Sequence, residues 1–192
     1  DNRHFDGSLA QDFARKFTAA MDCRGLYLSQ ALAKKLDLSG RSCMLDIGAG
    51  SGIYASSIAS QHKDLKAIAF DQAPVDRIAA KLIEERGCAD RVSVATGNMF
   101  DGLPGGCDVH LYSNVLHDWG VAEVKQLLAV SHAAMKPGDL LIIHDAFINA
   151  EKNGPLHVAE YSCLLMHSTQ GKCYSIGEYA ALLDEAGFTP GE

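Results

Sequence analysis

The chain has 192 residues, enough for one compact domain with a substantial core, and its 47% hydrophobic content argues against disorder. The 17 basic and 24 acidic residues give a net charge of −7 with no run of Lys and Arg, which argues against a nucleic-acid partner. No signal peptide is recognisable, and no apolar run approaches the roughly 18 residues of a membrane span. A soluble, cytoplasmic protein without a membrane partner is therefore expected.

The pattern of apolar residues predicts alternating helices and strands. Phe13, Phe17, Met21, Leu28 and Leu32 recur at helical spacing, so a helix is expected over about 8–35, with a break near 23–25 that could divide it in two. Short apolar runs then predict strands, and helical patterns lie between and after them. The expected strands are 42–48, 65–71, 91–96, 107–113 and 138–147, and the expected helices are 52–62, 74–86, 121–135, 155–168 and 175–186.

Strands that alternate with helices in this way are typical of parallel pairing. We therefore expect an α/β fold: a doubly wound, Rossmann-like, mostly parallel sheet with helices on both faces, preceded by a helical segment. Residues 1–40 would form the helical segment, and 41–192 the α/β domain. The chain begins with Asp1 and stops at "EAGFTPGE", where another strand should begin, so it is expected to be a longer polypeptide truncated at both ends.

The six cysteines are scattered along the chain. None forms a Cys-x-x-Cys pair, and none has a His at a metal-ligand interval, so no metal site is expected. They are interpreted as free thiols of a reducing compartment rather than a disulfide framework. These residues are Cys23, Cys43, Cys88, Cys107, Cys163 and Cys173.

A glycine-rich turn, "LDIGAGSG" (45–52), follows the first predicted strand. Glycine allows a tight turn and a close approach of the backbone to a ligand. The spacing is Gly-x-Gly-x-Gly, whereas a dinucleotide fold requires Gly-x-Gly-x-x-Gly, and Ile53 occupies that last place. Asp71 ends the next strand, where a carboxylate can accept hydrogen bonds from both ribose hydroxyls. The alternatives are an ordinary turn at the glycines and a helix-capping role for Asp71.

A further strand, in "VHLYSNVLHDWG" (109–120), is followed at once by His117, Asp118 and Trp119. Together with "LDIGAGSG", "AFDQAP" and "GNMF", the segment "NVLHDW" resembles the class I S-adenosylmethionine-dependent methyltransferases. More narrowly, the chain resembles the O-methyltransferase family of plant phenolic, hydroxyindole and bacterial natural-product enzymes, from about Phe13 to Gly187. The resemblance implies methyl transfer from S-adenosyl-L-methionine to a hydroxyl of a small, aromatic acceptor, with S-adenosyl-L-homocysteine as product. It also implies a homodimer when the protein is full length.

The resemblance also assigns cofactor-binding residues. Gly48, Gly50 and Gly52 would border the methionine part, Asp71 would hold the ribose, and Asn98, in place of the family's Asp, would accept from the adenine amine. Met99 and Trp119 would pack on the adenine, and Ser113 would bind the amino-acid end. Asn98 as a turn residue and Met99 as core filler stay open. The full cofactor set is Asp46, Gly48, Gly50, Gly52, Asp71, Gln72, Asn98, Met99, Ser113 and Trp119.

His117 is the candidate general base, because an imidazole can take a hydroxyl proton at neutral pH. Asp145, at the end of the fifth strand, corresponds to a family acid that orients the imidazole. A second family acid is replaced by Cys173 in "GKCYS", a thiol that cannot share the imidazolium charge. Asp118 is expected to cap the following helix instead. The alternative for His117 is a structural histidine bonded to a backbone carbonyl.

The acceptor pocket is expected between the N-terminal helix and the "AEYSCLLMH" helix (159–167), although apolar side chains at this spacing can equally be core. The candidates are Phe13, Phe17, Met21, Tyr161, Leu165, Met166 and His167. Two other functions stay open. An NAD-dependent oxidoreductase is disfavoured by the glycine spacing, and a non-catalytic nucleoside-binding domain is made conceivable by Cys173.

Overall fold

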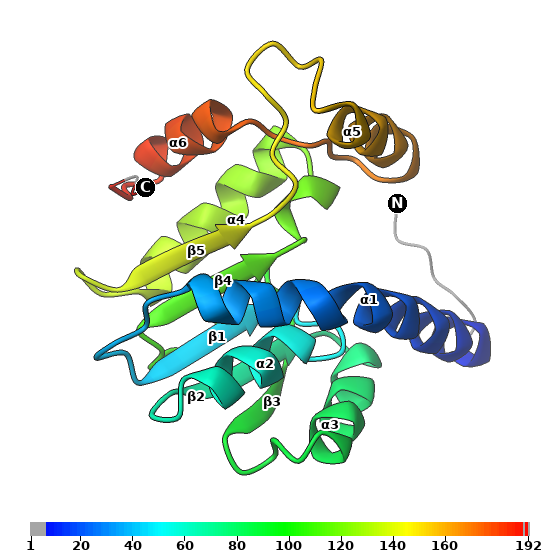
Figure 1. The fold of residues 1–192 in the computed structure, drawn as a ribbon, viewed down its shortest axis with the longest axis vertical. Coiled ribbons are helices and arrows are strands. Elements are labelled where there is room, and N and C mark those ends of the chain that lie inside the picture. The colour runs from blue at the N-terminus through cyan, green and yellow to red at the C-terminus, as the bar shows by residue number, and fades with distance from the viewer. Residues whose placement is uncertain (1–6, 190, 192) are drawn as a thin grey trace.

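The computed structural model describes residues 7–189 and 191, and contains a five-stranded, all-parallel sheet in the order β3-β2-β1-β4-β5 (Figure 1). The strands are β1 Cys43–Ile47, β2 Lys66–Asp71, β3 Val92–Thr96, β4 Val109–Ser113 and β5 Leu140–His144. The helices are α1 Gly7–Lys35, α2 Ile53–Gln61, α3 Val75–Glu85, α4 Val121–Ala134, α5 Leu156–Ser168 and α6 Ile176–Glu185, with a 3₁₀ turn, η1, at Leu116–Asp118. The predicted doubly wound α/β fold is confirmed.

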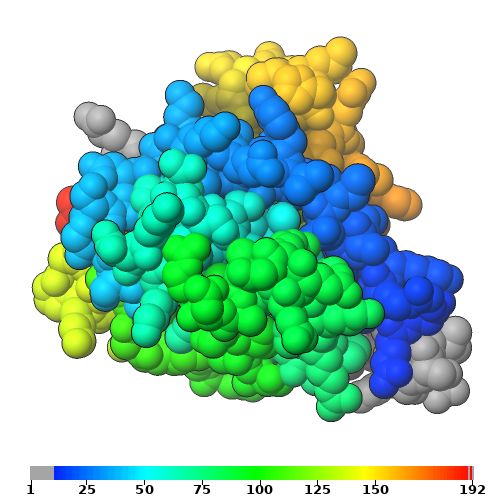
Figure 2. Space-filling model, turned by 60° about the horizontal axis from the view of Figure 1, so that its bottom comes forward, coloured from blue at the N-terminus to red at the C-terminus, as the bar shows by residue number. Residues whose placement is uncertain are grey.

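Two apolar cores lie on opposite faces of the sheet because successive strand residues point to opposite sides. In β1, Met44 packs with the core that α1, α2 and α3 cover, whereas Leu45 and Ile47 pack with the core that α4 and α6 cover. Both faces of the central strands are therefore buried, which explains their short, nearly continuous apolar sequences. On one face, α1 runs as a continuous band beside α2 (Figure 2).

The expected break in the first helix is wrong, since α1 is one helix of 29 residues. Gly25 lies inside it and is buried. A Cβ at this position would lie 2.6 Å from Cγ2 of Ile53, so the glycine allows α1 to pack closely on α2 rather than ending the helix.

No helix in the described part of the chain is long and apolar enough to cross a membrane.

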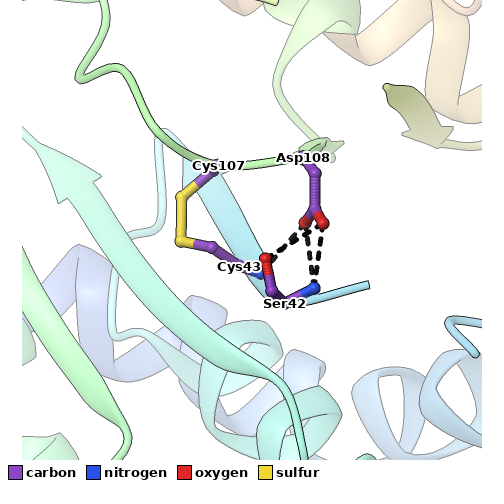
Figure 3. The surroundings of a disulfide bond; sticks show 4 residues. All are labelled: Ser42, Cys43, Cys107 and Asp108. Atoms are coloured by element: carbon purple, nitrogen blue, oxygen red, sulfur yellow. Dashed lines mark hydrogen bonds between the residues drawn. A yellow bond between two sulfur atoms is a disulfide. The ribbon is translucent and has the colours of Figure 1, made fainter. Parts of the chain in front are cut away.

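The prediction that all six cysteines are free thiols is wrong for two of them. Cys43 at the start of β1 and Cys107 just before β4 form a disulfide, with Cα atoms 4.5 Å apart (Figure 3). These strands are adjacent in the sheet but 64 residues apart along the chain, so sequence spacing did not indicate the pair. Asp108 reinforces the junction by accepting a hydrogen bond from the backbone N–H of Cys43 at 2.9 Å. Cys23, Cys88, Cys163 and Cys173 are free thiols.

Candidate active site

The candidate site lies at the carboxyl ends of β1 and β4, the two central strands from which the chain winds outward in opposite directions. In open α/β sheets this reversal of strand order leaves a crevice at which ligands bind. The glycine turn follows β1, and η1, which carries His117, begins two residues after Asn114 at the end of β4.

The glycine turn is tied to the end of β2, through the backbone of Phe70 and the side chain of Asp71. The N–H of Gly50 donates to Oδ2 of Asp71 at 2.8 Å, and the N–H of Gly48 donates to the carbonyl of Phe70 at 2.9 Å. Gly50 has a φ of +57°, in the left-handed region that favours glycine, and a Cβ there would meet nothing within 4 Å. The backbone therefore faces open space at Gly50, which fits a cofactor that approaches the loop directly.

Two carboxylates stand at this end of the sheet. The Asp71 side chain also accepts from the N–H of Gln72, and its pKa is raised by burial. Asp71 does not cap α3, because Pro74 is the N-cap and no side chain caps that helix. Asp46 is buried in β1, accepts from the N–H of Ala55 in α2 at 3.1 Å, and has a pKa that burial raises to about 7. Asp46 thus holds α2 against β1.

Asn98 and Met99 lie in the turn after β3. The exposed Asn98 side chain accepts from the N–H of Phe100 at 3.2 Å and donates to Asp101 at 3.1 Å, as a turn residue does. Met99 packs against the core beneath α4. In the structure, Asn98 is therefore a turn residue and Met99 packs with the core, which are the two alternatives that the sequence left open.

Trp119 and Asp118 follow His117 in the "HDW" segment. The indole of Trp119 is half-buried and makes an edge-on contact with the ring of Phe100, with centroids 4.7 Å apart. The prediction that Asp118 caps α4 is wrong, since Gly120 is the N-cap and no side chain caps the helix. Asp118 instead places Oδ1 3.6 Å from Nε2 of His117.

The imidazole of His117 is held between α5 and the end of β5. Its Nδ1 is hydrogen-bonded to Oδ1 of Asp145, and both side chains are buried. Asp145 is fixed in turn by the N–H of Ala146 at 2.8 Å and the hydroxyl of Tyr179 at 3.2 Å. A carboxylate in this place fixes the ring orientation and stabilises the imidazolium. The structure thus brings together the two residues predicted to be catalytic. Nδ1 of His117 is bonded to a side-chain carboxylate rather than to a backbone carbonyl, which was the alternative.

Residues that the sequence did not indicate complete the site. Arg24 in α1 donates to the hydroxyl of Tyr161 at 3.0 Å and to Oδ1 of Asn114 at 3.3 Å, and Tyr161 lies 3.2 Å from Nε2 of His117. Arg24 and Asn114 are 90 residues apart, so no local motif links them. A signal was present for Asn114, the polar residue directly after β4, which adopts a φ of +55°.

Ser113 points to the neighbouring strand. Its Oγ lies 2.9 Å from Nδ1 of His144, and Nδ2 of Asn114 donates to it at 3.3 Å. Burial lowers the pKa of His144, which favours a neutral ring as the partner of this hydroxyl. Tyr54 of α2 accepts from Asn114 at 3.1 Å and packs on His144, so the group joins α2 to β4 and β5.

Cys173 fills the place where the resemblance expected a second acid. Its thiol is buried with Ile148, Val158 and Leu165, and its N–H donates to Ser162 at 3.1 Å. Burial, followed by the nearby charge of Asp145, raises the pKa of the thiol, so it is neutral at neutral pH. Cys173 is therefore a packed, inert thiol rather than a charged partner of His117.

The predicted acceptor-binding residues occupy three different environments. Phe17 is 52% exposed on α1 and stacks on Phe13, and Met21 is also exposed. Tyr161 contacts His117, whereas Leu165 is only 4% exposed and belongs to the core with Cys173. Met166 and His167 are exposed on α5. Tyr161 is thus the one of these residues that the structure brings to the imidazole.

One cavity, of about 420 Å³, lies away from this group of residues, between α1 and α2. Leu26, Ile53, Ser56 and Arg86 are among its lining residues, and neither Asp71 nor His117 reaches it. The candidate active site is therefore defined by chemistry at the strand ends and not by this cavity.

The parallel sheet, its switch point and the glycine turn define the class: a doubly wound α/β domain with a buried His–Asp pair at the carboxyl edge of its sheet. The chain belongs to the O-methyltransferase domain family, whose sequence model matches residues 7–189.

Individual relatives agree with this membership. The chain is 31% identical over 160 residues to the 3-hydroxy-5-methyl-1-naphthoate 3-O-methyltransferase of Streptomyces sahachiroi, covering 83% of this chain and 46% of that protein. An O-methyltransferase family 2 protein from Planctomyces limnophilus, solved in complex with apigenin, is 34% identical with a TM-score of 0.86, over 93% of this chain and 57% of that one. Human N-acetylserotonin methyltransferase, solved with S-adenosylmethionine, is 26% identical with a TM-score of 0.84, over 91% and 50%. The chain thus spans about half the length of the curated relatives it matches.

Proposed function

We propose that the protein transfers a methyl group from S-adenosyl-L-methionine to a hydroxyl of a small aromatic molecule. The observation that carries the proposal is the buried His117–Asp145 pair, which follows β4 and β5 beside the glycine turn after β1. The family membership supports the cofactor and the reaction type. The naphthoate enzyme and the apigenin complex among the relatives support an aromatic acceptor.

The cofactor, when bound, supplies an electrophilic methyl group on a sulfonium. The glycine turn and the Asp71 carboxylate would hold it: Gly50 faces open space, and Asp71 lies at the end of the neighbouring strand. We further propose the remaining cofactor contacts expected from the sequence, with Asp46 and Gln72 supporting the loop and its carboxylate, Trp119 and Met99 against the adenine, Asn98 at its amine, and Ser113 at the amino-acid end. For Asn98 this requires its turn hydrogen bonds to rearrange on binding.

His117 is the base that ends up with the proton released when the acceptor's hydroxyl is methylated in this proposal. Asp145 accepts from Nδ1, so the lone pair of the neutral ring lies on Nε2, the atom that can receive a proton. The imidazolium that forms then has the carboxylate of Asp145 at one nitrogen and that of Asp118 3.6 Å from the other. General-base assistance of this kind contributes about 10²–10⁴ in rate.

The test is methyl transfer from isotopically labelled S-adenosylmethionine to a panel of phenols, with products identified by mass spectrometry. We expect His117→Gln to lower kcat by about 10²–10⁴ without changing the affinity for S-adenosylhomocysteine. The matched control is His157→Gln, since His157 is exposed on α5. Thermal stabilisation by NAD but not by S-adenosylhomocysteine would instead favour an oxidoreductase, and cofactor binding without turnover on any acceptor would favour a binding domain.

The location and assembly of the protein stay predictions. We propose a cytoplasmic homodimer in which residues 1–40 cover the acceptor and 41–192 carry the chemistry, from the family resemblance. The Cys43–Cys107 disulfide removes the argument that scattered thiols indicate a reducing compartment. Thiol counting on protein from unreduced lysate, and light scattering on the full-length protein, test these two points.

A further inference from the structure

The Nε2 atom of His117 has a hydrogen-bond partner within the chain itself. The hydroxyl oxygen of Tyr161 lies 3.2 Å from Nε2. The two rings meet edge to face, with centroids 5.5 Å apart and an interplanar angle of 85°. Tyr161 comes from α5, 44 residues along the chain, so this contact is made by the tertiary fold.

The direction of the hydrogen bonds follows from the chemistry of their ends. The carboxylate of Asp145 only accepts, so in the neutral imidazole of His117 the proton lies on Nδ1 and the lone pair on Nε2. The guanidinium of Arg24 only donates, so the Tyr161 oxygen accepts its bond at 3.0 Å. The phenolic proton of Tyr161 is then directed to Nε2. A continuous chain of donors therefore runs from Arg24 through Tyr161 to the imidazole.

This arrangement poses a problem of access for the acceptor. Nε2 has a single lone pair, and a hydroxyl that loses its proton directly to it must approach to about 2.6–3.2 Å. The Tyr161 hydroxyl occupies that lone pair, whereas its own oxygen, which accepts one bond from Arg24, has a second lone pair to offer.

We propose that Tyr161 is the group that receives the acceptor's proton and that it relays its own proton to His117, with Arg24 as a positioning residue. The inference rests on the proposed methyl transfer. The acceptor's O–H bond breaks and its proton moves to the Tyr161 oxygen. The original Tyr161 proton moves to Nε2, so Tyr161 ends neutral. The electron pair left on the acceptor oxygen forms the bond to the methyl carbon, and the carbon–sulfur bond breaks with its electrons kept by sulfur.

Several contacts hold Tyr161 in this place. The Arg24 guanidinium carbon lies 5.0 Å from the centre of the Tyr161 ring, a cation–π contact in addition to the hydrogen bond. Arg24 is anchored at its other nitrogen by Asn114, which belongs to the end of β4. Burial raises the pKa of Tyr161, so the phenol keeps its proton at neutral pH and the relay begins from the neutral form.

The principal test is Tyr161→Phe, which removes the hydroxyl and keeps the ring. We expect kcat to fall by about 10- to 100-fold, while the affinity for S-adenosylhomocysteine is unchanged. The control is Tyr27→Phe, because Tyr27 is 78% exposed on α1. A second readout needs no turnover. Without added ligand, the ¹⁵N resonance of His117 Nε2 in Tyr161→Phe should shift, relative to the wild type, toward the value of an imidazole nitrogen that accepts no hydrogen bond.

Arg24→Gln tests the positioning role separately. This side chain is exposed, so the variant is expected to fold, and Arg77→Gln on the exposed surface of α3 is the control. We expect Arg24→Gln to lower kcat with little change in KM, and Arg24→Lys to recover part of the loss. If Arg24→Gln and Arg24→Lys were both as active as the wild type, Arg24 would have no role in the relay.

The outcomes separate the relay from the proposed function. A Tyr161→Phe enzyme with kcat within threefold of the wild type, or with a raised kcat/KM, overturns the relay and leaves methyl transfer intact. A lowered kcat without any change at Nε2 also overturns it, because the contact on which it depends would be absent. A wild-type protein that transfers no methyl group overturns the proposed function and the relay together.

Discussion

Gly171 offers the sharpest test of how His117 is positioned. A Cβ at this residue would overlap the carbonyl oxygen of His117 and would lie 2.6 Å from both the carbonyl carbon of His117 and the backbone nitrogen of Trp119. The neighbours are backbone atoms, which cannot rotate away as a flexible side chain can. The contact is also tied by a hydrogen bond of 3.2 Å from the N–H of Gln170 to the carbonyl of Asp118.

Gly171→Ala should therefore displace η1 relative to the segment before α6. Restoring an ordinary contact distance moves one backbone by about 1 Å, and overpacking of this kind costs about 1–3 kcal/mol of unfolding free energy. A displacement of about 1 Å at the reacting group lowers kcat by about 10²-fold. Urea denaturation measures the first effect, and labelled-methyl transfer with S-adenosylhomocysteine titration measures the second.

The control for this variant is Gly177→Ala, since a Cβ at Gly177 in α6 would meet nothing within 4 Å. Alanine in a helix is favoured over glycine by about 0.5–1 kcal/mol, so this variant should be slightly more stable and fully active. If Gly171→Ala were as stable as the wild type and kept its kcat, the close packing of the 169–172 segment on η1 would be refuted.

Three further predictions concern the strand ends. Asp145→Asn should lower kcat by about 10²-fold or more while S-adenosylhomocysteine still binds. The reason is that an amide cannot accept hydrogen bonds from both His117 and Tyr179 as the carboxylate does. Initial rates measure kcat and titration calorimetry measures binding; an unchanged kcat would contradict the prediction. Gly52→Ala should lower the free energy of unfolding by about 2–4 kcal/mol, because a φ of +68° is combined with a Cβ only 2.8 Å from Ile83. Gly87→Ala, which has a φ of +67° but open space around the Cβ, should lower it by about 1–2 kcal/mol. Equal losses in urea denaturation would contradict the packing contribution at Gly52. Asp46, whose pKa burial raises from 3.8 to about 7, holds a proton in the folded protein that it loses in the unfolded chain, so stability should fall as pH rises from about 4 to 7, by up to about 4 kcal/mol. Asp46→Asn should remove this decline. If the free energy of unfolding, measured by urea denaturation, fell equally from pH 5 to pH 8 in the wild type and in Asp46→Asn, Asp46 would not be its cause.

The sheet could be predicted from the sequence because its signals are local. Each strand is a short apolar run, and each helix repeats at its own period, so the alternation specifies parallel pairing. The glycine turn and the residues after β4 follow from the same pattern, since the carboxyl ends of parallel strands share one edge. Errors arose where a residue type has two uses. The glycine within 23–25 suggests a helix break, but the missing side chain of Gly25 serves the packing of α1 on α2.

Long-range partners could not be predicted. The Cys43–Cys107 disulfide joins residues 64 apart in sequence, and Arg24 reaches Tyr161 across 137 residues. Such pairs depend on the relative positions of α1, α5 and the strands, which no single motif contains. His117 and Asp145 were predicted together only because the family resemblance supplied the second residue, and burial of both side chains then explains why they must pair.

The replacement of an expected acid by Cys173 does not leave the imidazole with a carboxylate on one side only. The thiol is neutral and packed among apolar side chains, so it contributes no charge. Asp118, released from the capping role that Gly120 takes, lies 3.6 Å from Nε2. An imidazolium at His117 would thus lie between Asp145 at Nδ1 and Asp118 near Nε2, and both carboxylates would stabilise its charge. The position of the second carboxyl group in the chain differs from the one expected, but a carboxyl group still lies near each ring nitrogen of His117.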